Sequence, residues 1–357
     1  MNIYEQQARN RRMTWGVMFV FVVFFLVIGL GFDFFYLSFN PALTPGYKWN
    51  AAGYYEAAAA SQPVPYGTIF ALLIGFGLVA NSMMNGAKMV LRSTQARPAV
   101  PANDKERQFL NVVAEMSTAA GLTPPAAYIV PDADLNAFAA GLTPESSVIA
   151  VTEGLLSSLN REELQAVVAH EMSHIRNYDM RLMTVSAALM GAIALLSDLA
   201  GRSMRPRYRS SGGFSSSSSG SSSGGRKGGG GALMLILFVV WIVLVVLAPL
   251  ISRLLAMAIS REREYLADAS GAELTRNPLA LVSALEKIRN AVMPTYAINN
   301  GVAHMCIADP RGSLIEEKMG LAADLFATHP PMEKRILALK VMAYQAVRGQ
   351  RNSEAGK

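Results

Sequence analysis

Apolar residues along the chain form two kinds of pattern: long unbroken runs, and shorter segments in which they alternate with polar residues. A helix needs about 20 apolar residues, each rising 1.5 Å, to cross a bilayer. Two runs near the N-terminus meet this requirement and predict membrane-spanning helices at about 13–36 and 67–85. Residues 182–200 and 232–252 form a second apolar pair, of which the first carries several polar side chains. Up to four transmembrane helices are therefore predicted.

The periodic segments between and after these runs predict an α+β domain. Residues 104–121 have the apolar spacing of an amphipathic helix, and Gly121 is a suitable C-terminal stop. Short β-like runs follow at Ala127–Val130, Ala137–Ala140 and Ser147–Val151. Later helix starts are predicted at Asn160, which has Glu163 three residues on as in a capping box, at Asn277-Pro278, and at Thr328.

Composition and charge agree with a membrane protein. Only 16% of the residues are charged, against about 25% in a typical soluble domain. The net charge of +6 is not gathered beside a nucleic-acid-binding module, so no nucleic-acid partner is expected. With a single cysteine, Cys306, the chain can form neither an intrachain disulfide nor a Cys-based zinc site. We expect Cys306 to be a small buried hydrophobe.

The distribution of basic residues predicts the orientation of the first pair. Three arginines precede the first run and three basic residues follow the second, whereas only Lys48 lies between them. The positive-inside rule then places the N-terminus and the region after residue 85 in the cytoplasm. The loop between the second pair is also basic, which opposes an external position, so this pair either spans or lies as a hairpin against protein or membrane.

The strongest chemical signal is His170-Glu171-Met172-Ser173-His174, an H-E-x-x-H motif. On a helix, residues four apart lie on one face, so both imidazoles can reach one ion. Two neutral nitrogens suit zinc, and Glu171 is placed to take the proton of a water molecule. A catalytic zinc needs a third protein ligand. In Ser260-Arg-Glu-Arg-Glu-Tyr-Leu-Ala-Asp268 the spacing leaves three candidates open: Glu262, Glu264 and Asp268.

Four motifs together resemble the HtpX family of membrane zinc metallopeptidases, which is related to the CAAX prenyl proteases. They are Asn136-Ala-Phe-Ala139, the stretch Val167–Ile175 around the two histidines, Ser260–Asp268, and Thr328-His-Pro-Pro-Met-Glu-Lys-Arg335. The resemblance implies one zinc ion per chain, with Glu264 as the third ligand and Asp268 as a carboxylate that orients a ligand imidazole. It also implies that His329 lies near the zinc and donates to the oxyanion of the reaction.

Two further sites accompany these. Arg335 is expected either to pair with Asp268 or to hold substrate. The run Asn136, Ala137, Phe138 and Ala139 is interpreted as an edge strand, which can bind an extended substrate by backbone pairing. His304 has no partner motif, lies in an alternating run that indicates a strand, and is expected to be structural.

The expected protein is thus a mostly helical, zincin-like peptidase domain with a small β-sheet and up to four transmembrane helices. Its predicted parts are a transmembrane hairpin (1–92), a first catalytic half (93–181), the second apolar pair (182–252) with a flexible Ser/Gly linker (210–231), and a second catalytic half (253–357).

The resemblance implies proteolysis of misfolded or surplus membrane proteins at the bacterial inner membrane, with the catalytic domain facing the cytoplasm. Expected partners are polypeptide substrates, unfolded or membrane-bound, and the lipid bilayer. Two alternatives remain. A CAAX-type prenyl-protein peptidase is disfavoured because at most four spans are found. A catalytically silent scaffold is disfavoured because it has no need of Glu171.

Overall fold

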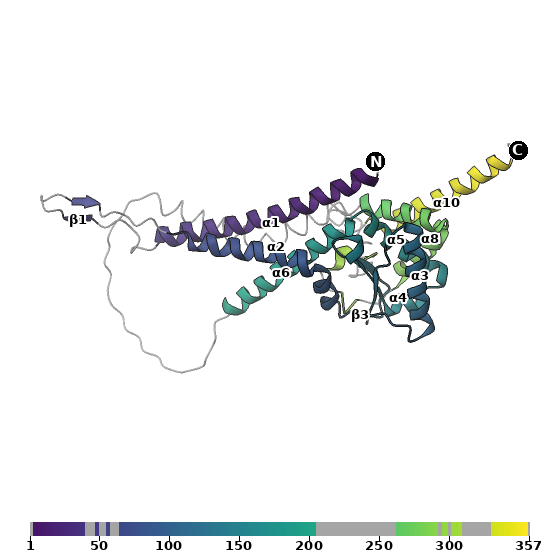
Figure 1. Ribbon diagram of the computed structural model, residues 1–357, viewed down its shortest axis with the longest axis horizontal. Coiled ribbons are helices and arrows are strands. Elements are labelled where there is room, and N and C mark those ends of the chain that lie inside the picture. Colours follow the sequence, from purple (N-terminus) through teal and green to yellow (C-terminus); the bar gives the residue numbers. More distant parts are fainter. Residues whose placement is uncertain are drawn as a thin grey trace. The chain divides into compact units, whose positions relative to one another are not determined.

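A computed structural model of the chain describes residues 3–39, 47–49, 55–57, 64–204, 262–291, 295–298, 301–308 and 330–355 (Figure 1). The Ser/Gly tract 210–231, the apolar run 232–252, Thr328 and His329 lie outside these ranges. The chain divides into two compact units, one made of Met1–Phe21, Phe76–Gly191 and Ile251–Lys357, the other of Val22–Gly75 and Ala192–Leu250. The part boundaries predicted at residues 92, 181 and 252 stay predictions.

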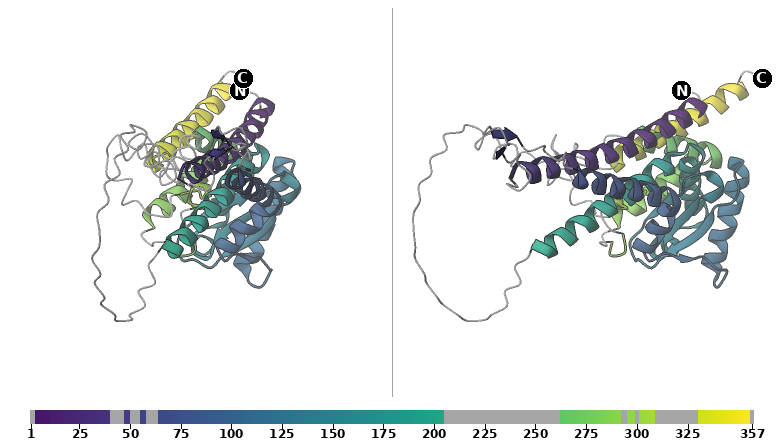
Figure 2. Two further views of the ribbon diagram at one scale, coloured as in Figure 1. Left: turned by 90° about the vertical axis from the view of Figure 1, so that its left-hand side faces the viewer. Right: turned by 60° about the vertical axis from the view of Figure 1, so that its left-hand side comes forward.

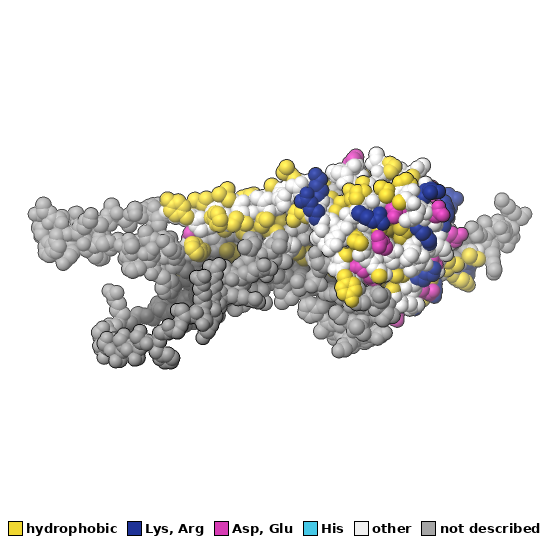
Figure 3. Space-filling view, turned by 90° about the horizontal axis from the view of Figure 1, so that it is seen from below, with side chains coloured by type: hydrophobic (Ala, Val, Ile, Leu, Met, Phe, Trp, Pro, Cys, Tyr) yellow, Lys and Arg dark blue, Asp and Glu magenta, His cyan; other side chains and the backbone are white. Residues whose placement is uncertain are grey.

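Two long helices match the first predicted apolar pair. They are α1 (Ile3–Phe39), drawn as one unbroken purple helix in Figure 2, and α2 (Tyr66–Ser93). Within the described residues, Glu5–Phe34 and Tyr66–Ser93 are the two helices long and apolar enough to cross a membrane. On the face drawn in Figure 3, hydrophobic side chains (yellow) line the elongated part of the molecule, and most of the charged side chains (blue and magenta) lie on its globular part. The predicted spans 13–36 and 67–85 thus correspond to helices of suitable length and composition.

The smaller unit contains the turn between these helices. The predicted outer loop 41–65 includes two short antiparallel strands, β1 (Tyr47–Trp49) and β2 (Tyr55–Ala57). Asp33 of α1 accepts hydrogen bonds from the first amides of α2, Gly67 N at 2.8 Å and Thr68 N at 2.7 Å, and from the Thr68 hydroxyl at 2.7 Å. Two of these bonds satisfy N–H groups at the start of α2, which have no partner within the helix.

The larger unit is built on a four-stranded sheet with the order β3-β4-β6-β5. Its strands are β3 (Arg97–Pro98), β4 (Ala126–Val130), β5 (Ala137–Ala140) and β6 (Val148–Thr152). The β4–β6 pair is parallel, and the β3–β4 and β5–β6 pairs are antiparallel. The three predicted strands are confirmed to within one residue. The two-residue β3 was not predicted, because it is too short to show alternation.

Both faces of this sheet are covered, because successive residues of a strand point to opposite faces. Ala137, Ala139, Ile149 and Val151 belong to one buried cluster, together with side chains of α3, α5 and α8. Phe138, Ala140, Val148 and Ala150 belong to a second, together with Val90 and Leu91 of α2 and Met183 and Ala187 of α6. The two strands β5 and β6 are therefore buried on both faces, unlike those of a sheet with one wet face.

The described helices after α2 include α3 (Asp104–Ala120), α4 (Glu153–Ser158), α5 (Arg161–Arg176), α6 (Asp179–Met204), α8 (Pro278–Asn290) and α10 (Met332–Ala355). Helices α3, α5 and α8 begin at or next to the predicted positions. Helix α4 was not predicted, and the start predicted at Thr328 lies outside the described residues. Gly121 ends α3 with φ +67°, a left-handed conformation that glycine adopts at little cost. The predicted third span, 182–200, lies in α6, whose residues up to 191 belong to the larger unit and are largely buried. Its crossing of a membrane stays a prediction.

Candidate metal centre

Helix α5 carries the H-E-x-x-H motif and is held at its start by the predicted capping box. Asn160 Oδ1 accepts from Glu163 N, and Glu163 Oε2 accepts from Asn160 N, each at 2.9 Å. Lys287 and Ser283 of α8 donate to the same Glu163 carboxylate at 2.7 Å. Every residue from 166 to 175 is buried. Apart from its exposed first turn, α5 is largely enclosed, so its buried polar side chains need partners inside the protein.

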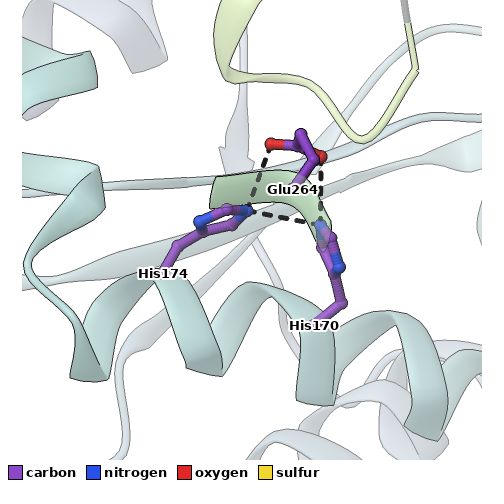
Figure 4. A group of neighbouring side chains, drawn as sticks. All are labelled: His170, His174 and Glu264. Atoms are coloured by element: carbon purple, nitrogen blue, oxygen red, sulfur yellow. Dashed lines mark hydrogen bonds and ion pairs between the residues drawn. The ribbon is translucent and has the colours of Figure 1, made fainter. Parts of the chain in front are cut away.

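Three of these buried polar groups converge. His170 and His174 project from α5 toward Glu264 (Figure 4), which lies in the helical segment 262–275. The two Nε2 atoms are 3.3 Å apart, and each is 3.6 Å from a Glu264 carboxylate oxygen. All three side chains are at most 3% exposed. The alternatives left open by spacing are thereby separated, because the Glu262 side chain is 88% exposed and the Asp268 carboxylate lies on the far side of the His170 ring.

This donor set fits a zinc ion. Two donors each about 2.0–2.1 Å from a tetrahedral zinc ion are about 3.3 Å apart, close to the separations observed here. Two imidazoles and one carboxylate are also the set found in catalytic sites that keep a fourth position open. The two Nε2 atoms and the Glu264 carboxylate also point toward one common centre, and the three side chains are at most 3% exposed. The arrangement is therefore one that a metal ion would stabilise.

Glu171 lies beside this group and is 1% exposed. Within the described residues, neither of its carboxylate oxygens has a hydrogen-bond partner. Burial raises the pKa of Glu171, and the nearby charge of Glu264 adds to this effect, while the two histidines and Arg335 oppose it. A buried carboxylate with unused acceptors and a raised pKa is suited to take and return a proton near neutral pH.

Asp268 and Arg335 form a charged network on the Nδ1 side of His170. Asp268 Oδ1 lies 3.0 Å from His170 Nδ1, and Arg335 donates to both Asp268 oxygens at 2.8 and 2.7 Å. Burial alone lowers the pKa of His170, but Asp268 and Glu264 outweigh it and raise the pKa from 6.5 to about 9. In the metal-free protein His170 is therefore protonated at pH 7, and a cation binding there displaces that proton. Of the two roles considered for Arg335, pairing with Asp268 is the one observed.

Asp179 supports the other histidine, and the sequence interpretation missed it. Its Oδ2 lies 3.4 Å from His174 Nδ1, and the residue is fully buried. Metal-binding histidines commonly turn their second nitrogen to a carboxylate in this way. The signal in the sequence was an acidic residue at the start of the next helix, five residues after His174, where it also resembles an ordinary helix-capping residue.

The predicted substrate strand has an unexpected neighbour. Asn136–Ala139 runs into β5 at the sheet edge, as predicted, but Ile307 N donates to Ala137 O at 2.9 Å and Phe138 bridges Cys306. Asn136 Nδ2 also donates to Ala308 O at 3.1 Å. Among the described residues, the first half of this edge is thus already paired, and substrate binding at Asn136, Ala137, Phe138 and Ala139 stays a prediction.

The remaining predicted positions are placed as follows. Cys306 is buried, as expected. His304 lies in a short 3-10 turn rather than in the predicted strand, because the chain folds back there to reach β5, and its Nε2 is 3.1 Å from Met183 O. His329 lies outside the described residues, so its role stays a prediction.

Gly271 sets the distance between the segment that carries Glu264 and α5. A Cβ atom at this position would lie 2.9 Å from the backbone nitrogen of His170, and a backbone atom cannot move aside. We expect Gly271→Ala to destabilise the protein by about 1–3 kcal/mol, as overpacking does, and to weaken metal binding by pushing Glu264 outward. Thermal unfolding and zinc titration measure the two effects.

Gly191 of α6 provides the matched control, because nothing lies within 4 Å of a Cβ atom built there. Alanine in an open helical position stabilises by about 0.5–1 kcal/mol relative to glycine. If Gly271→Ala and Gly191→Ala unfold at the same temperature, the close approach at His170 is not what fixes the spacing.

Comparisons with known proteins identify the family of the chain. Residues 103–343 match Peptidase family M48. A Protease HtpX homolog from Streptococcus equi subsp. equi is 37% identical over 299 residues, which are 82% of this chain and 90% of the relative. Another, from Streptococcus pneumoniae serotype 4, is 36% identical over 340 residues, which are 95% of this chain and 100% of the relative.

Among solved structures, a crystal structure of S. mikatae Ste24p matches with 17% identity and a TM-score of 0.42. That match covers 77% of this chain and 57% of the other, so this chain spans less than two thirds of that protein. The family match covers more than half of the chain and includes both histidines of α5, the segment with Glu264, and Arg335. The resemblance to HtpX proteases is therefore confirmed, and the chain is a protease that belongs to peptidase family M48.

Proposed function

We propose that the protein is a zinc metalloendopeptidase in which His170, His174 and Glu264 hold one zinc ion. The observation that carries this proposal is the buried convergence of the three side chains, with donor atoms at 3.3 and 3.6 Å. Bound there, zinc would supply a Lewis acid that acidifies a water molecule and polarises a carbonyl group.

The chain's own residues would do the rest of the chemistry. Glu171 takes the proton from the attacking water and later returns it to the departing amine. Asp268 and Asp179 hold the two imidazoles by their Nδ1 sides, so that each Nε2 faces the centre. His329 is proposed, on the motif that contains it, to donate to the carbonyl oxygen as negative charge develops. An extended substrate is proposed to pair with β5 beyond the part that already pairs with residues 306–308.

The proposed substrates are unfolded or membrane-bound polypeptides, and the proposed setting is the bacterial inner membrane with the catalytic unit in the cytoplasm. Binding through backbone pairing demands an extended chain but little sequence selectivity. The basic residues before α1 and after α2 support this orientation. Protein quality control is the role that follows for an enzyme of such broad selectivity.

The test is digestion of an unfolded model protein by the purified full-length enzyme in detergent. Cleavage should stop with a chelator and return when zinc is added. If stoichiometric zinc is bound but no unfolded protein is cleaved, the enzyme has either a narrow specificity or no activity, and the proposed broad endopeptidase function is wrong.

Replacing Glu264 tests the ligand assignment directly. We expect Glu264→Ala to lose zinc, because two imidazoles alone leave a catalytic zinc without its third protein ligand. Metal content is measured after dialysis against a weak chelator. Glu262→Ala is the matched control, since that side chain is 88% exposed and should leave the zinc content unchanged. Full zinc occupancy in Glu264→Ala would show that Glu264 is not a zinc ligand.

A further inference from the structure

The start of the first long helix holds the turn that follows the second histidine. Helix α1 carries none of the candidate metal ligands. Three of its side chains contact the last residue of α5 or the two residues that join α5 to α6. These contacts are Gln7 Nε2 to Arg176 O at 2.7 Å, Asn10 Nδ2 to Asn177 O at 2.8 Å, and the Arg11 guanidinium 4.5 Å from the Tyr178 ring centre. All of them lie within the larger unit.

Asn10 makes one contact that the other two do not. Its Nδ2 also donates to Asp179 Oδ1 at 2.5 Å. An amide nitrogen has two hydrogens, and here both are used, one on a carbonyl oxygen and one on a carboxylate oxygen. Because both partners accept hydrogen bonds, the nitrogen and not the oxygen of the amide must face them. Asn10 is 3% exposed and Asp179 is fully buried, so water does not replace these bonds.

Asp179 joins Asn10 to the metal centre. One carboxylate oxygen faces Asn10, and the other lies 3.4 Å from His174 Nδ1. Arg263 Nη1 lies 3.9 Å from Asp179 Oδ1, the same oxygen that accepts from Asn10. Without Asn10, that oxygen would be drawn toward Arg263, and the carboxylate would turn relative to the His174 ring.

We propose that Asn10 is a positioning residue of the metal centre, which fixes Asp179 so that the His174 ring presents Nε2 to the ion. The inference rests on the proposed zinc site. It assigns the first helix a second task beside anchoring: the segment that enters the membrane also sets the orientation of one ligand, although it lies 164 residues before that ligand in the chain. The metal centre is therefore completed only when the N-terminal helix is in place.

The test replaces Asn10 by leucine in the full-length protein, which keeps the size of the side chain and removes both donors. Zinc affinity is measured by competition with a chelator, and the visible absorption spectrum of the cobalt-loaded protein reports the ligand geometry. Loss of a group that orients a ligand typically weakens metal binding about 10–100-fold. We expect a loss in this range and a shifted cobalt spectrum.

Gln7→Ala is the matched control, because Gln7 bonds the same turn one residue earlier but does not contact Asp179. It should keep the wild-type affinity and spectrum. Equal losses in Asn10→Leu and Gln7→Ala would show that α1 only stabilises the turn, and an unchanged Asn10→Leu protein would show no link at all. Either result overturns the proposal.

Two further measurements keep the outcome clear. If Asn10→Leu does not fold, Asp179→Asn takes its place, since its amide would present His174 with a neutral partner; an unchanged affinity there also overturns the proposal. Wild-type protein that binds no zinc would instead refute the proposed function, because Asn10 affects only how tightly an existing site binds.

Discussion

The Glu171→Gln enzyme should hydrolyse peptide bonds about 10²–10⁴-fold more slowly than the wild type, the range contributed by a positioned general base. Glutamine matches glutamate in shape but accepts no proton from water near neutral pH. Burial raises the pKa of Glu171 in the metal-free protein, and a glutamine at this position could not take up a proton at all. Cleavage rates of an unfolded model protein, at equal zinc content, measure the effect.

The same substitution should leave the fold intact. The raised pKa means that the ionised carboxylate is disfavoured in the folded, metal-free protein. Stability from this group is present below its unfolded pKa and is lost as the pH rises through the folded value. Glutamine removes the charge, so the metal-free variant should unfold at pH 7 no earlier than the wild type. Loss of zinc together with activity would instead make Glu171 a metal-binding residue.

Local signals allowed most of α5 to be predicted. The capping residues Asn160 and Glu163, the spacing of the two histidines and the neighbouring apolar residues all act within a few turns of one helix. The burial of every residue from 166 to 175 was not predictable, because it depends on α3, α8 and the sheet, which are brought together by contacts between residues far apart in the chain.

Sequence spacing alone did not identify the third metal ligand among the acidic residues 262, 264 and 268. Glu264 and Asp268 are four residues apart and so share a helix face, but spacing does not say which face meets α5. Gly271 supplies the answer, because it continues the same face and permits the close approach to His170. A glycine seven residues after a candidate ligand was thus a usable signal.

Asp179 and Asn10 had no comparable signal. Their contact joins residues 169 positions apart, and each has an ordinary local explanation, a helix-capping carboxylate and a polar residue before a membrane span. Only the folded arrangement shows that they act on His174. The pairing of residues 306–308 with β5 was also not predictable from the sequence. It follows from the turn at Ala303–Met305, where the alternating pattern had indicated a strand.

Arg335→Met should be the most destabilising single change at the site. The Arg335 side chain is fully buried, donates to both oxygens of Asp268 and to Ile307 O at 2.7 Å, and lies 3.4 Å from Glu264. Removing one partner of a buried ion pair leaves an uncompensated charge and costs about 3–5 kcal/mol. For a unit of this size 1 kcal/mol corresponds to about 2–4 °C, so the thermal midpoint should fall by about 6–20 °C.

Two companion variants separate charge from geometry. Arg335→Lys keeps the positive charge but not the planar fork that bonds both Asp268 oxygens, so it should lie between the wild type and Arg335→Met. Adding Asp268→Asn to Arg335→Met removes the stranded carboxylate and should restore part of the lost stability, although His170 would then lose the carboxylate at 3.0 Å that orients it. The double variant should therefore be more stable than Arg335→Met and still bind zinc weakly. If the double variant were no more stable, the cost would come from lost packing of the arginine side chain and not from an unpaired buried charge.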